Sequence, residues 1–361
     1  MGKKAKPVAL VTGANGLIGS NLVRELLHEG YSVKVLVRTS SNLESLDGLD
    51  VSIVYGDILK PETLTDAFKN CDYLFHCAAV FSYWGSSHKE LNQIAVNGTL
   101  NVLKAARDSD IKRIVVTSSS VTMGSSSDPV VRTESCSFED PDPPPYTLAK
   151  LAQEQSSFEF ADEHNLDLVA VCPTMSIGAY GQNLGPSNGI ITTYLADPFK
   201  TTFPGGCNLV SVRDIARGHI LAQQKGSAGE RYLLGSENLK WSEIHGMISE
   251  LCGVSGPLFT ASHATSYLSA AVLELGAKLK GKQPVTTREQ AKMVGRYYWY
   301  SHEKIAQLGY SPIPARQALA EAIAWLVTTA HISRETRTGL TLTREIYAAR
   351  KNILLRGSQI S

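Results

Sequence analysis

The sequence lacks a long apolar segment, a paired cysteine motif and an excess of either charge. No apolar run reaches the roughly 18 residues that a membrane span requires, so we expect no transmembrane segment. The 35 Lys and Arg residues nearly balance the 34 Asp and Glu residues, and a balanced chain has no net field to attract nucleic acid or an anionic membrane. We therefore expect a protein that acts on a small molecule, without nucleic-acid partners.

The six cysteines form no C-x-x-C pair and have no histidine nearby at metal-ligand spacing. Isolated cysteines of this kind are typical of reduced thiols in the interior of a cytoplasmic protein. No apolar segment of a signal peptide precedes the first expected strand, which favours the same location. We expect a cytoplasmic protein without a metal site.

An apolar strand, a glycine-rich turn and an amphipathic helix follow one another between residues 8 and 27. The turn has the spacing G-x-x-G-x-x-G, a variant of the dinucleotide fingerprint G-x-G-x-x-G. Glycines let the backbone approach a ligand closely, and the N–H groups at the start of the helix attract a pyrophosphate. A tight connection without a ligand is the alternative. The turn residues expected to bind a dinucleotide are Gly13, Asn15, Gly16, Leu17, Ile18 and Gly19.

Apolar runs alternate with helical patterns as far as residue 173. This alternation predicts an α/β fold with a doubly wound parallel sheet of the Rossmann type, whose ligand crevice lies at the carboxyl ends of the strands. A return to this sheet is expected at residues 208–212, and helical patterns dominate residues 241–328. The helix expected at 267–279 covers a substrate pocket or, as the alternative, lies on a membrane surface.

These patterns divide the chain into three regions. We expect a Rossmann domain over residues 1–173 and 207–235, a smaller, mainly helical C-terminal substrate-binding lobe over 174–206 and 236–328, and a C-terminal extension over 329–361 that is an extra helix or a loose tail.

Arg38 stands at the end of the second expected strand, and the next acidic residue is Glu44. A ribose 2′-hydroxyl is usually held by an acidic side chain at this place, whereas a 2′-phosphate needs a cation. Arg38, with Ser41 beside it, therefore favours NADP(H) over NAD(H), and a solvated Arg at a strand end is the alternative. Asp57 follows the third strand, where it would accept a hydrogen bond from adenine or cap a turn.

Tyr146 and Lys150 lie four residues apart at the start of a predicted helix, so they share one helix face. A nearby ammonium favours the phenolate and lowers the pKa of a Tyr hydroxyl from about 10, which suits the pair to acid–base work on an alcohol or carbonyl oxygen. Ser119, at the end of a neighbouring strand, would hold the same oxygen. A Tyr and a Lys at this spacing often occur by chance. The position of this pair after the fifth strand, in a chain that opens with a nucleotide turn, favours a catalytic role.

Several motifs together resemble the extended branch of the short-chain dehydrogenase/reductase superfamily. They are the Thr-Gly-x-x-Gly-x-x-Gly turn, Asp57, the His-Cys-Ala-Ala segment at 76–79, Asn97, the serine run at 118–120 and the Tyr146/Lys150 pair. The resemblance covers residues 7 to about 328. Within the branch, the chain is most similar to dihydroflavonol reductase-type carbonyl reductases and to hopanoid-associated sugar epimerase-like proteins.

The resemblance implies roles for the residues that match it. Tyr146 would donate the proton, Ser119 would orient the substrate oxygen, and Lys150 would hold the nicotinamide ribose and tune Tyr146. Asn97 would support a helix kink and a proton relay, while Ser118 and Ser120 are alternatives to Ser119. His76 is interpreted as a packed core residue. Further implied cofactor contacts are Ile58, Ala78, Ala79, Thr117, Pro173 and Ile177. A homodimer through the helices at 91–106 and 147–164 is also implied.

Three reactions fit these residues: reduction of a ketone or aldehyde, epimerisation or dehydration of a nucleotide sugar, and dinucleotide sensing without catalysis. An alcohol oxidation like that of 3-beta-hydroxysteroid dehydrogenases is a variant of the first. Sugar-nucleotide enzymes of this resemblance carry an Arg before the strand at 208–212, where this chain has Gly205, Gly206 and Cys207. Arg213 and Arg296 are possible substitutes. A complete catalytic set argues against sensing.

The substrate is expected to be bulky and apolar or aromatic, because large apolar side chains stand beside the expected site. Core packing is the alternative for each of them. The candidates for the substrate pocket are Phe81, Tyr83, Trp84, Met123 and Met175.

Overall fold

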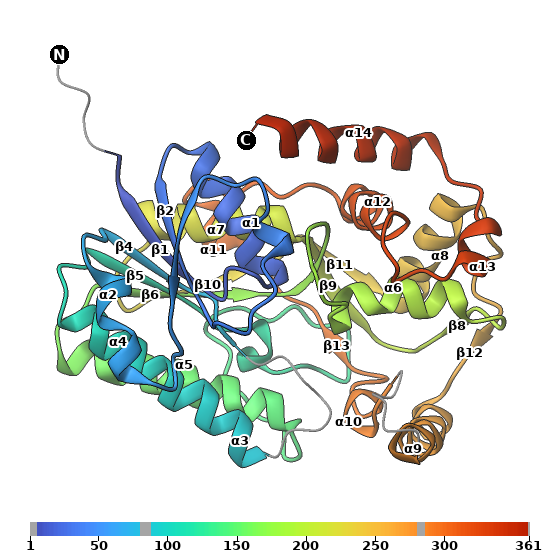
Figure 1. Ribbon diagram of the computed structural model, residues 1–361. Coiled ribbons are helices and arrows are strands. Elements are labelled where there is room, and N and C mark those ends of the chain that lie inside the picture. Colours follow the sequence, from blue (N-terminus) through green and yellow to red (C-terminus); the bar gives the residue numbers. More distant parts are fainter. Residues whose placement is uncertain (1–5, 80–87, 280–285, 360–361) are drawn as a thin grey trace.

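A seven-stranded parallel sheet forms the centre of the structure (Figure 1), a computed structural model that describes residues 6–79, 88–279 and 286–359. The strand order is β10-β6-β5-β4-β1-β2-β3. Successive strands are added on one side of β1 as far as β3 and on its other side from β4 onward. At such a switch point, between β1 and β4, a doubly wound sheet leaves a crevice at the carboxyl ends of its strands. The predicted fold is confirmed. The strands are β1 (Val8–Thr12), β2 (Ser32–Val37), β3 (Val51–Tyr55), β4 (Tyr73–His76), β5 (Arg113–Thr117), β6 (Leu168–Pro173) and β10 (Arg231–Leu234).

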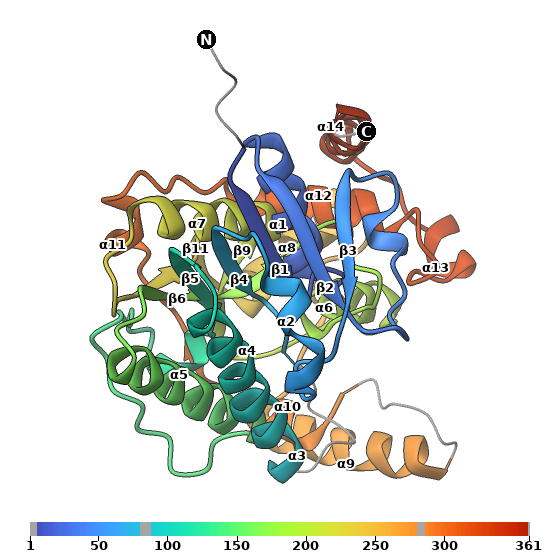
Figure 2. The same ribbon diagram turned by 60° about the vertical axis from the view of Figure 1, so that its left-hand side comes forward.

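Helices cover both faces of this sheet because its strands are apolar on both sides. Successive side chains of a strand point to opposite faces: in β4, Leu74 packs into one apolar cluster and Phe75 into the other. Figure 2 shows α1 and α7 on one face and a second group, containing α4 and α5, on the other. The first pair is α1 (Leu17–His28) and α7 (Val212–Lys225), and the second group is α2 (Thr65–Phe68), α4 (Gly98–Arg107) and α5 (Pro145–Glu163).

A second, smaller sheet lies in the C-terminal lobe, which we expected to be mainly helical. Its centre is β9 (Gly206–Ser211), which pairs with β7, β11 and β13. The expectation that residues 208–212 return to the main sheet is therefore wrong. The reason is that β10, further along the chain, pairs with β6 at the edge of the main sheet. The partners of β9 are β7 (Met175–Ile177), β11 (Glu237–Lys240) and β13 (Tyr297–Tyr298).

Four helices enclose the core of this lobe, and the last of them comes from the C-terminal extension. Ile346, Ala349 and Ile353 of this last helix are buried against α12 and the lobe core. The extension thus contains a helix that docks on the lobe, as Figure 1 shows. The helices are α6 (Pro186–Ala196), α8 (Trp241–Cys252), α12 (Ala315–Leu326) and α14 (Arg344–Gln359).

The helix expected at 267–279 is present as α9 (His263–Leu279), but its large apolar side chains do not pack inward. It buries Ala270, Glu274 and Ala277, while Leu268, Val272, Leu275 and Leu279 are each more than 60% exposed. The expected cover of a substrate pocket would need these side chains to face the protein. Within the described ranges, no helix is both long enough and apolar enough to cross a membrane.

The glycine-rich turn between β1 and α1 is closely packed at two positions. Gly13 has a φ of +67°, and a Cβ there would lie 2.6 Å from the Ala78 nitrogen. A Cβ on Gly19 would lie 2.1 Å from the Gly13 carbonyl oxygen, far inside van der Waals contact. These two glycines therefore let the turn close against both the end of β4 and its own helix.

The packing at Gly19 predicts that Gly19→Ala lowers stability. The added methyl group must push the Gly13 carbonyl away, and overpacking of this kind costs about 1–3 kcal/mol. Gly189→Ala is the matched control, because Gly189 lies in α6 with nothing within 4 Å of an added Cβ and should gain about 0.5–1 kcal/mol. Urea unfolding of the two variants measures the difference. Equal stability of the two variants would contradict this account of the turn.

Candidate active site

The start of α5 places Tyr146 and Lys150 beside the carboxyl ends of the central strands. Pro145 occupies the first helical position, where its missing N–H costs no hydrogen bond and its fixed φ suits a helix. Tyr146 follows in the first turn, and Lys150 lies one turn later on the same face. Both side chains are buried, 8% and 4% exposed. The helix therefore holds a phenol and an amine inside the protein.

Ser119 follows β5 and meets the phenol of Tyr146 through a side-chain hydrogen bond. Ser119 also begins a short 3-10 helix, in which its Oγ accepts a hydrogen bond from Val121 N. Its neighbours have other partners: Ser118 Oγ donates to Glu154, and Ser120 bonds to Tyr300. Of the three serines considered, the structure brings Ser119 to the tyrosine.

The phenol of Tyr146 is a protonated acid at neutral pH. Burial raises the pKa of Tyr146 to about 12, and the hydrogen bond from Ser119 lowers it by less. We expected the ammonium of Lys150 to lower this pKa, and that expectation is wrong for this structure. The reason is that Lys150 Nζ is engaged elsewhere, with Thr117 O at 3.0 Å and Gln153 Oε1 at 2.8 Å.

The amine of Lys150 is perturbed in the opposite direction. Burial lowers the pKa of Lys150 to about 8, although the nearby Cys77, Cys172 and Glu154 raise it. Its two direct partners in the described part of the chain are neutral oxygens, and no carboxylate of those residues forms an ion pair with it. The sequence analysis did not identify Gln153. Its position, three residues after Lys150 on the same helix face, could have indicated a partner for the amine.

Asn97 ends a one-turn π-helix, Gln93–Asn97, that interrupts the helix between α3 (His88–Asn92) and α4. Such bulges mark local distortions of a helix, and this one lies where the sequence predicted a kink. The side chain of Asn97 is exposed, however, whereas Thr99 is buried and bonds to Gln153. The structure therefore brings Thr99, and not the side chain of Asn97, toward the neighbourhood of Lys150.

The predicted dinucleotide contacts gather at the carboxyl ends of the strands. Ala78 N donates to Thr12 Oγ1, which ties the end of β4 to the glycine turn. Thr117 ends β5, and its Oγ1 lies 2.9 Å from His219 Nε2. Pro173 ends β6 and Ile177 ends β7. Ile177 is 1% exposed and packs in the lobe core, which differs from a side chain that lines a ring pocket.

The turn and the strand end next to it are suited to a dinucleotide. Gly16 is the N-cap of α1 and makes no side-chain cap, so the first N–H groups of the helix are available to a pyrophosphate. Arg38 is exposed at the end of β2, and its guanidinium makes no ion pair with another residue in the described part of the chain. Asp57 Oδ1 accepts a hydrogen bond from Leu59 N, which is the turn-capping alternative.

The predicted substrate pocket is only partly described. Phe81, Tyr83 and Trp84 lie outside the described residues. Met123 is fully buried in an apolar cluster that includes Tyr300, so its placement as pocket lining is corrected to core packing. Met175 is half-buried, with its Sδ 3.7 Å from the sulfur of Cys207.

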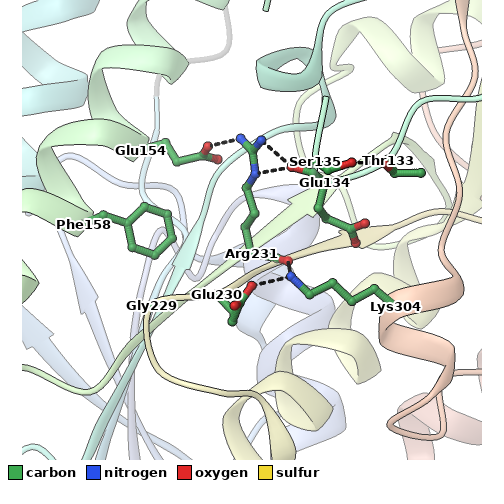
Figure 3. A pocket seen from close by; sticks show the side chains of 9 residues that line it. All are labelled: Thr133, Glu134, Ser135, Glu154, Phe158, Gly229, Glu230, Arg231 and Lys304. Atoms are coloured by element: carbon green, nitrogen blue, oxygen red, sulfur yellow. Dashed lines mark hydrogen bonds and ion pairs between the residues drawn. The ribbon is translucent and has the colours of Figure 1, made fainter. Parts of the chain in front are cut away.

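A hollow of about 490 Å³ lies beside α5, and four of the five charged side chains that line it form ion pairs with one another (Figure 3). Arg231 donates to Glu154 at 2.8 Å and to the backbone of Glu134, and Lys304 pairs with Glu230 at 2.5 Å. Tyr146 and Lys150 do not line it. We therefore assign its paired charges to the stability of the fold.

Comparisons with known proteins agree with this geometry. Residues 9–235 match the model of the family described as "NAD dependent epimerase/dehydratase family". Over 323 residues the chain is 34% identical to "Putative dihydroflavonol 4-reductase" of Synechocystis sp., covering 87% of this chain and 93% of that protein. It is 30% identical to Cinnamoyl-CoA reductase 1 of Oryza sativa subsp. japonica, covering 91% of this chain and 92% of that protein.

A solved structure gives the same result. The crystal structure of gox2253 superposes with a TM-score of 0.80 at 32% identity, over 91% of this chain and 100% of that one. The chain therefore belongs to the NAD dependent epimerase/dehydratase family, in the extended branch of the short-chain dehydrogenase/reductase superfamily, and is an NAD(P)-dependent enzyme.

Proposed function

We propose that this enzyme is an NADPH-dependent reductase of a fairly bulky, apolar or aromatic ketone or aldehyde. The observation that carries the proposal is the buried, protonated phenol of Tyr146 with Ser119 bonded to it. A carbonyl that gains a hydride becomes an alkoxide, and this phenol is in the form that can protonate it. The bound dinucleotide supplies the hydride.

The residues around Tyr146 have separate tasks in this proposal. Ser119 holds the carbonyl oxygen by a hydrogen bond and keeps it beside the phenol. Lys150 binds the nicotinamide ribose and restores the proton balance of the site after Tyr146 has donated. Burial of these groups excludes water, so charge that develops on the oxygen interacts strongly with the fixed donors.

The proposed preference for NADP(H) over NAD(H) rests on Arg38. Its guanidinium is exposed at the carboxyl end of β2, where a cation attracts a 2′-phosphate and an acidic residue would repel it. The hydroxyl of Ser41 lies in the same turn, since Ser41 N donates to Arg38 O. The open N-terminus of α1 would hold the pyrophosphate.

The second candidate is epimerisation or dehydration of a nucleotide sugar, which the family description favours. Such a substrate brings a second diphosphate that needs cations. Of the two candidate arginines, Arg213 is paired within the described residues, where its Nε donates to Glu25 at 3.1 Å. Arg296 forms no ion pair there and donates from Nε to the neutral Ser125 Oγ at 2.6 Å, so it is the one candidate cation left for that diphosphate. We therefore place this reaction second.

The division into domains, the homodimer through the helices at 91–106 and 147–164, and the cytoplasmic location stay predictions. The proposed reaction needs none of them, because Tyr146, Ser119, Lys150 and the glycine turn all come from one chain.

Incubation of the purified protein with NADPH and a panel of ketones, aldehydes and UDP-sugars tests the proposed function. We expect consumption of one NADPH for each alcohol formed from an apolar or aromatic carbonyl compound. Conversion of a sugar nucleotide without net consumption of NADPH would overturn the proposal in favour of the second candidate.

Tyr146→Phe removes the proton donor and leaves the ring in place. Because acid–base catalysis contributes typically 10²–10⁴-fold, we expect kcat to fall by at least about 10²-fold. Binding of NADPH, followed by fluorescence, should change little. Tyr347→Phe is the control, since Tyr347 is 59% exposed on α14. If Tyr146→Phe retains full turnover, the role assigned to Tyr146 is wrong.

Arg38→Glu replaces the cation at the end of β2 with a charge that repels a 2′-phosphate. Hydrogen bonds to charged groups contribute about 1.5–3 kcal/mol, so we expect the ratio of NADPH to NADH affinity to fall by at least about tenfold. Arg334→Glu makes the same charge change on the exposed helix α13 (Arg334–Thr338) and should leave the ratio unaltered. An unchanged ratio in Arg38→Glu would remove Arg38 from the 2′-phosphate site.

A further inference from the structure

We propose that Gln153 is a positioning residue that holds the amine of Lys150 in place. Gln153 is itself held by a buried chain of hydrogen bonds that begins beside the glycine turn. The inference rests on the proposed function for the role of Lys150. It concerns a side chain that touches neither substrate nor dinucleotide in that proposal.

The first part of the chain joins α5 to α4. Lys150 Nζ donates to Gln153 Oε1 at 2.8 Å, and Gln153 Nε2 donates to Thr99 Oγ1 at 2.9 Å. Gln153 and Thr99 are each 1% exposed. A glutamine is rarely buried to this extent unless its amide is satisfied, and here both ends of the amide have a partner.

The second part of the chain runs through the sheet. Thr99 Oγ1 lies 3.0 Å from His76 Nε2, and His76 Nδ1 lies 2.8 Å from Thr12 Oγ1. Thr12 Oγ1 also accepts a hydrogen bond from Ala78 N at 3.2 Å. Thr12 directly precedes Gly13, so the amine of Lys150 and the expected pyrophosphate site are joined by four consecutive side chains.

Counting donors and acceptors assigns a direction to this chain. An ammonium has donors only, so Gln153 must present its oxygen to Lys150 and its NH₂ group to Thr99. The hydroxyl proton of Thr99 is then available for His76 Nε2, which assigns the other ring proton to Nδ1 and a donor role toward Thr12. Burial, together with the charge of Lys150, lowers the pKa of His76 to about 3, so the ring is neutral as this assignment requires.

The surroundings of Lys150 explain why a neutral amide has a large effect there. Among the described residues, the titratable groups that face the amine are His76 and Cys77 at the end of β4, Cys172 on β6, and Glu154 on α5. Cys77, Cys172 and His76 are uncharged at neutral pH, because burial raises the pKa values of the thiols and lowers that of the imidazole.

The remaining group, the carboxylate of Glu154, is already engaged. It accepts hydrogen bonds from Ser118 and Arg231, so it does not contact the amine directly. Among the described residues, Gln153 Oε1 is thus one of two oxygens in direct contact with Lys150 Nζ, and the other is the Thr117 carbonyl. Removing this oxygen should destabilise the ammonium and lower the pKa of Lys150. Giving the oxygen a negative charge should stabilise the ammonium and raise that pKa.

The test is the titration of Lys150 itself, followed by NMR of protein labelled with ¹³C at the ε carbon of lysine. The Lys150 signal is assigned by its absence from Lys150→Met. Gln153→Met removes the oxygen at similar side-chain volume, and Gln153→Glu keeps the oxygen and adds a charge. Gln155→Met is the control, because Gln155 is exposed on the same helix and bonds to Glu159.

The two substitutions at Gln153 should move the titration midpoint in opposite directions. We expect Gln153→Met to lower it by roughly one pH unit and Gln153→Glu to raise it by at least as much, with no shift in Gln155→Met. Thr99→Val should give a smaller shift in the same direction as Gln153→Met, which keeps the test available if Gln153→Met does not fold. If Gln153→Met and Gln153→Glu move the midpoint in the same direction, or if neither moves it, the proposal is overturned.

Enzyme assays separate this inference from the proposed function. If both are right, the alkaline limb of kcat/KM for NADPH-dependent reduction moves with the titration midpoint of Lys150. If the midpoints move as expected but the wild-type protein reduces no carbonyl compound, the proposed function fails and the role of Gln153 stands. If turnover is present but the limb and the midpoint stay fixed in both variants, the role of Gln153 fails alone.

Discussion

Burial of an amine at the start of α5 is the constraint on which the site depends. An ammonium inside a protein is costly unless hydrogen bonds compensate for lost water, and Lys150 is held by two neutral oxygens. One of these oxygens ends a central strand, and the other is fixed through α4. The sheet, α4 and α5 must therefore be in their places before the amine can be, which makes the active site a product of the whole Rossmann domain.

The same constraint orders the charges around the site. Glu154 lies one turn after Lys150, yet it pairs with Arg231 on β10 and accepts a hydrogen bond from Ser118. This arrangement neutralises the Glu154 carboxylate, and the pKa of the Tyr146 phenol is set by burial and by Ser119. A protonated phenol and an ammonium held by neutral oxygens then lie one helical turn apart on α5, which suits a reaction that needs a proton at an oxygen and a second proton to replace it.

The main sheet and the positions of Ser119, Tyr146 and Lys150 were predictable because each follows from a local pattern: apolar runs that alternate with helical patterns, a glycine turn, and two residues one helical turn apart. The chain of hydrogen bonds was not predictable, since Thr12, His76, Thr99 and Gln153 are far apart in the sequence and only the packing of α4 on the sheet unites them. The predicted places of Met123, in the substrate pocket, and of the strand at 206–211, in the main sheet, were wrong for a related reason. A run of apolar residues predicts burial but does not determine which part of the core the run joins.

The central claim is that this site delivers hydride and proton to a carbonyl group and releases the alcohol. Reaction with NADPH that carries deuterium at the transferring position of the nicotinamide tests it most directly. The account predicts deuterium at the former carbonyl carbon of the product, with one oxidised dinucleotide released for each alcohol. Sugar-nucleotide product without deuterium, and no net oxidation of the dinucleotide, would contradict it.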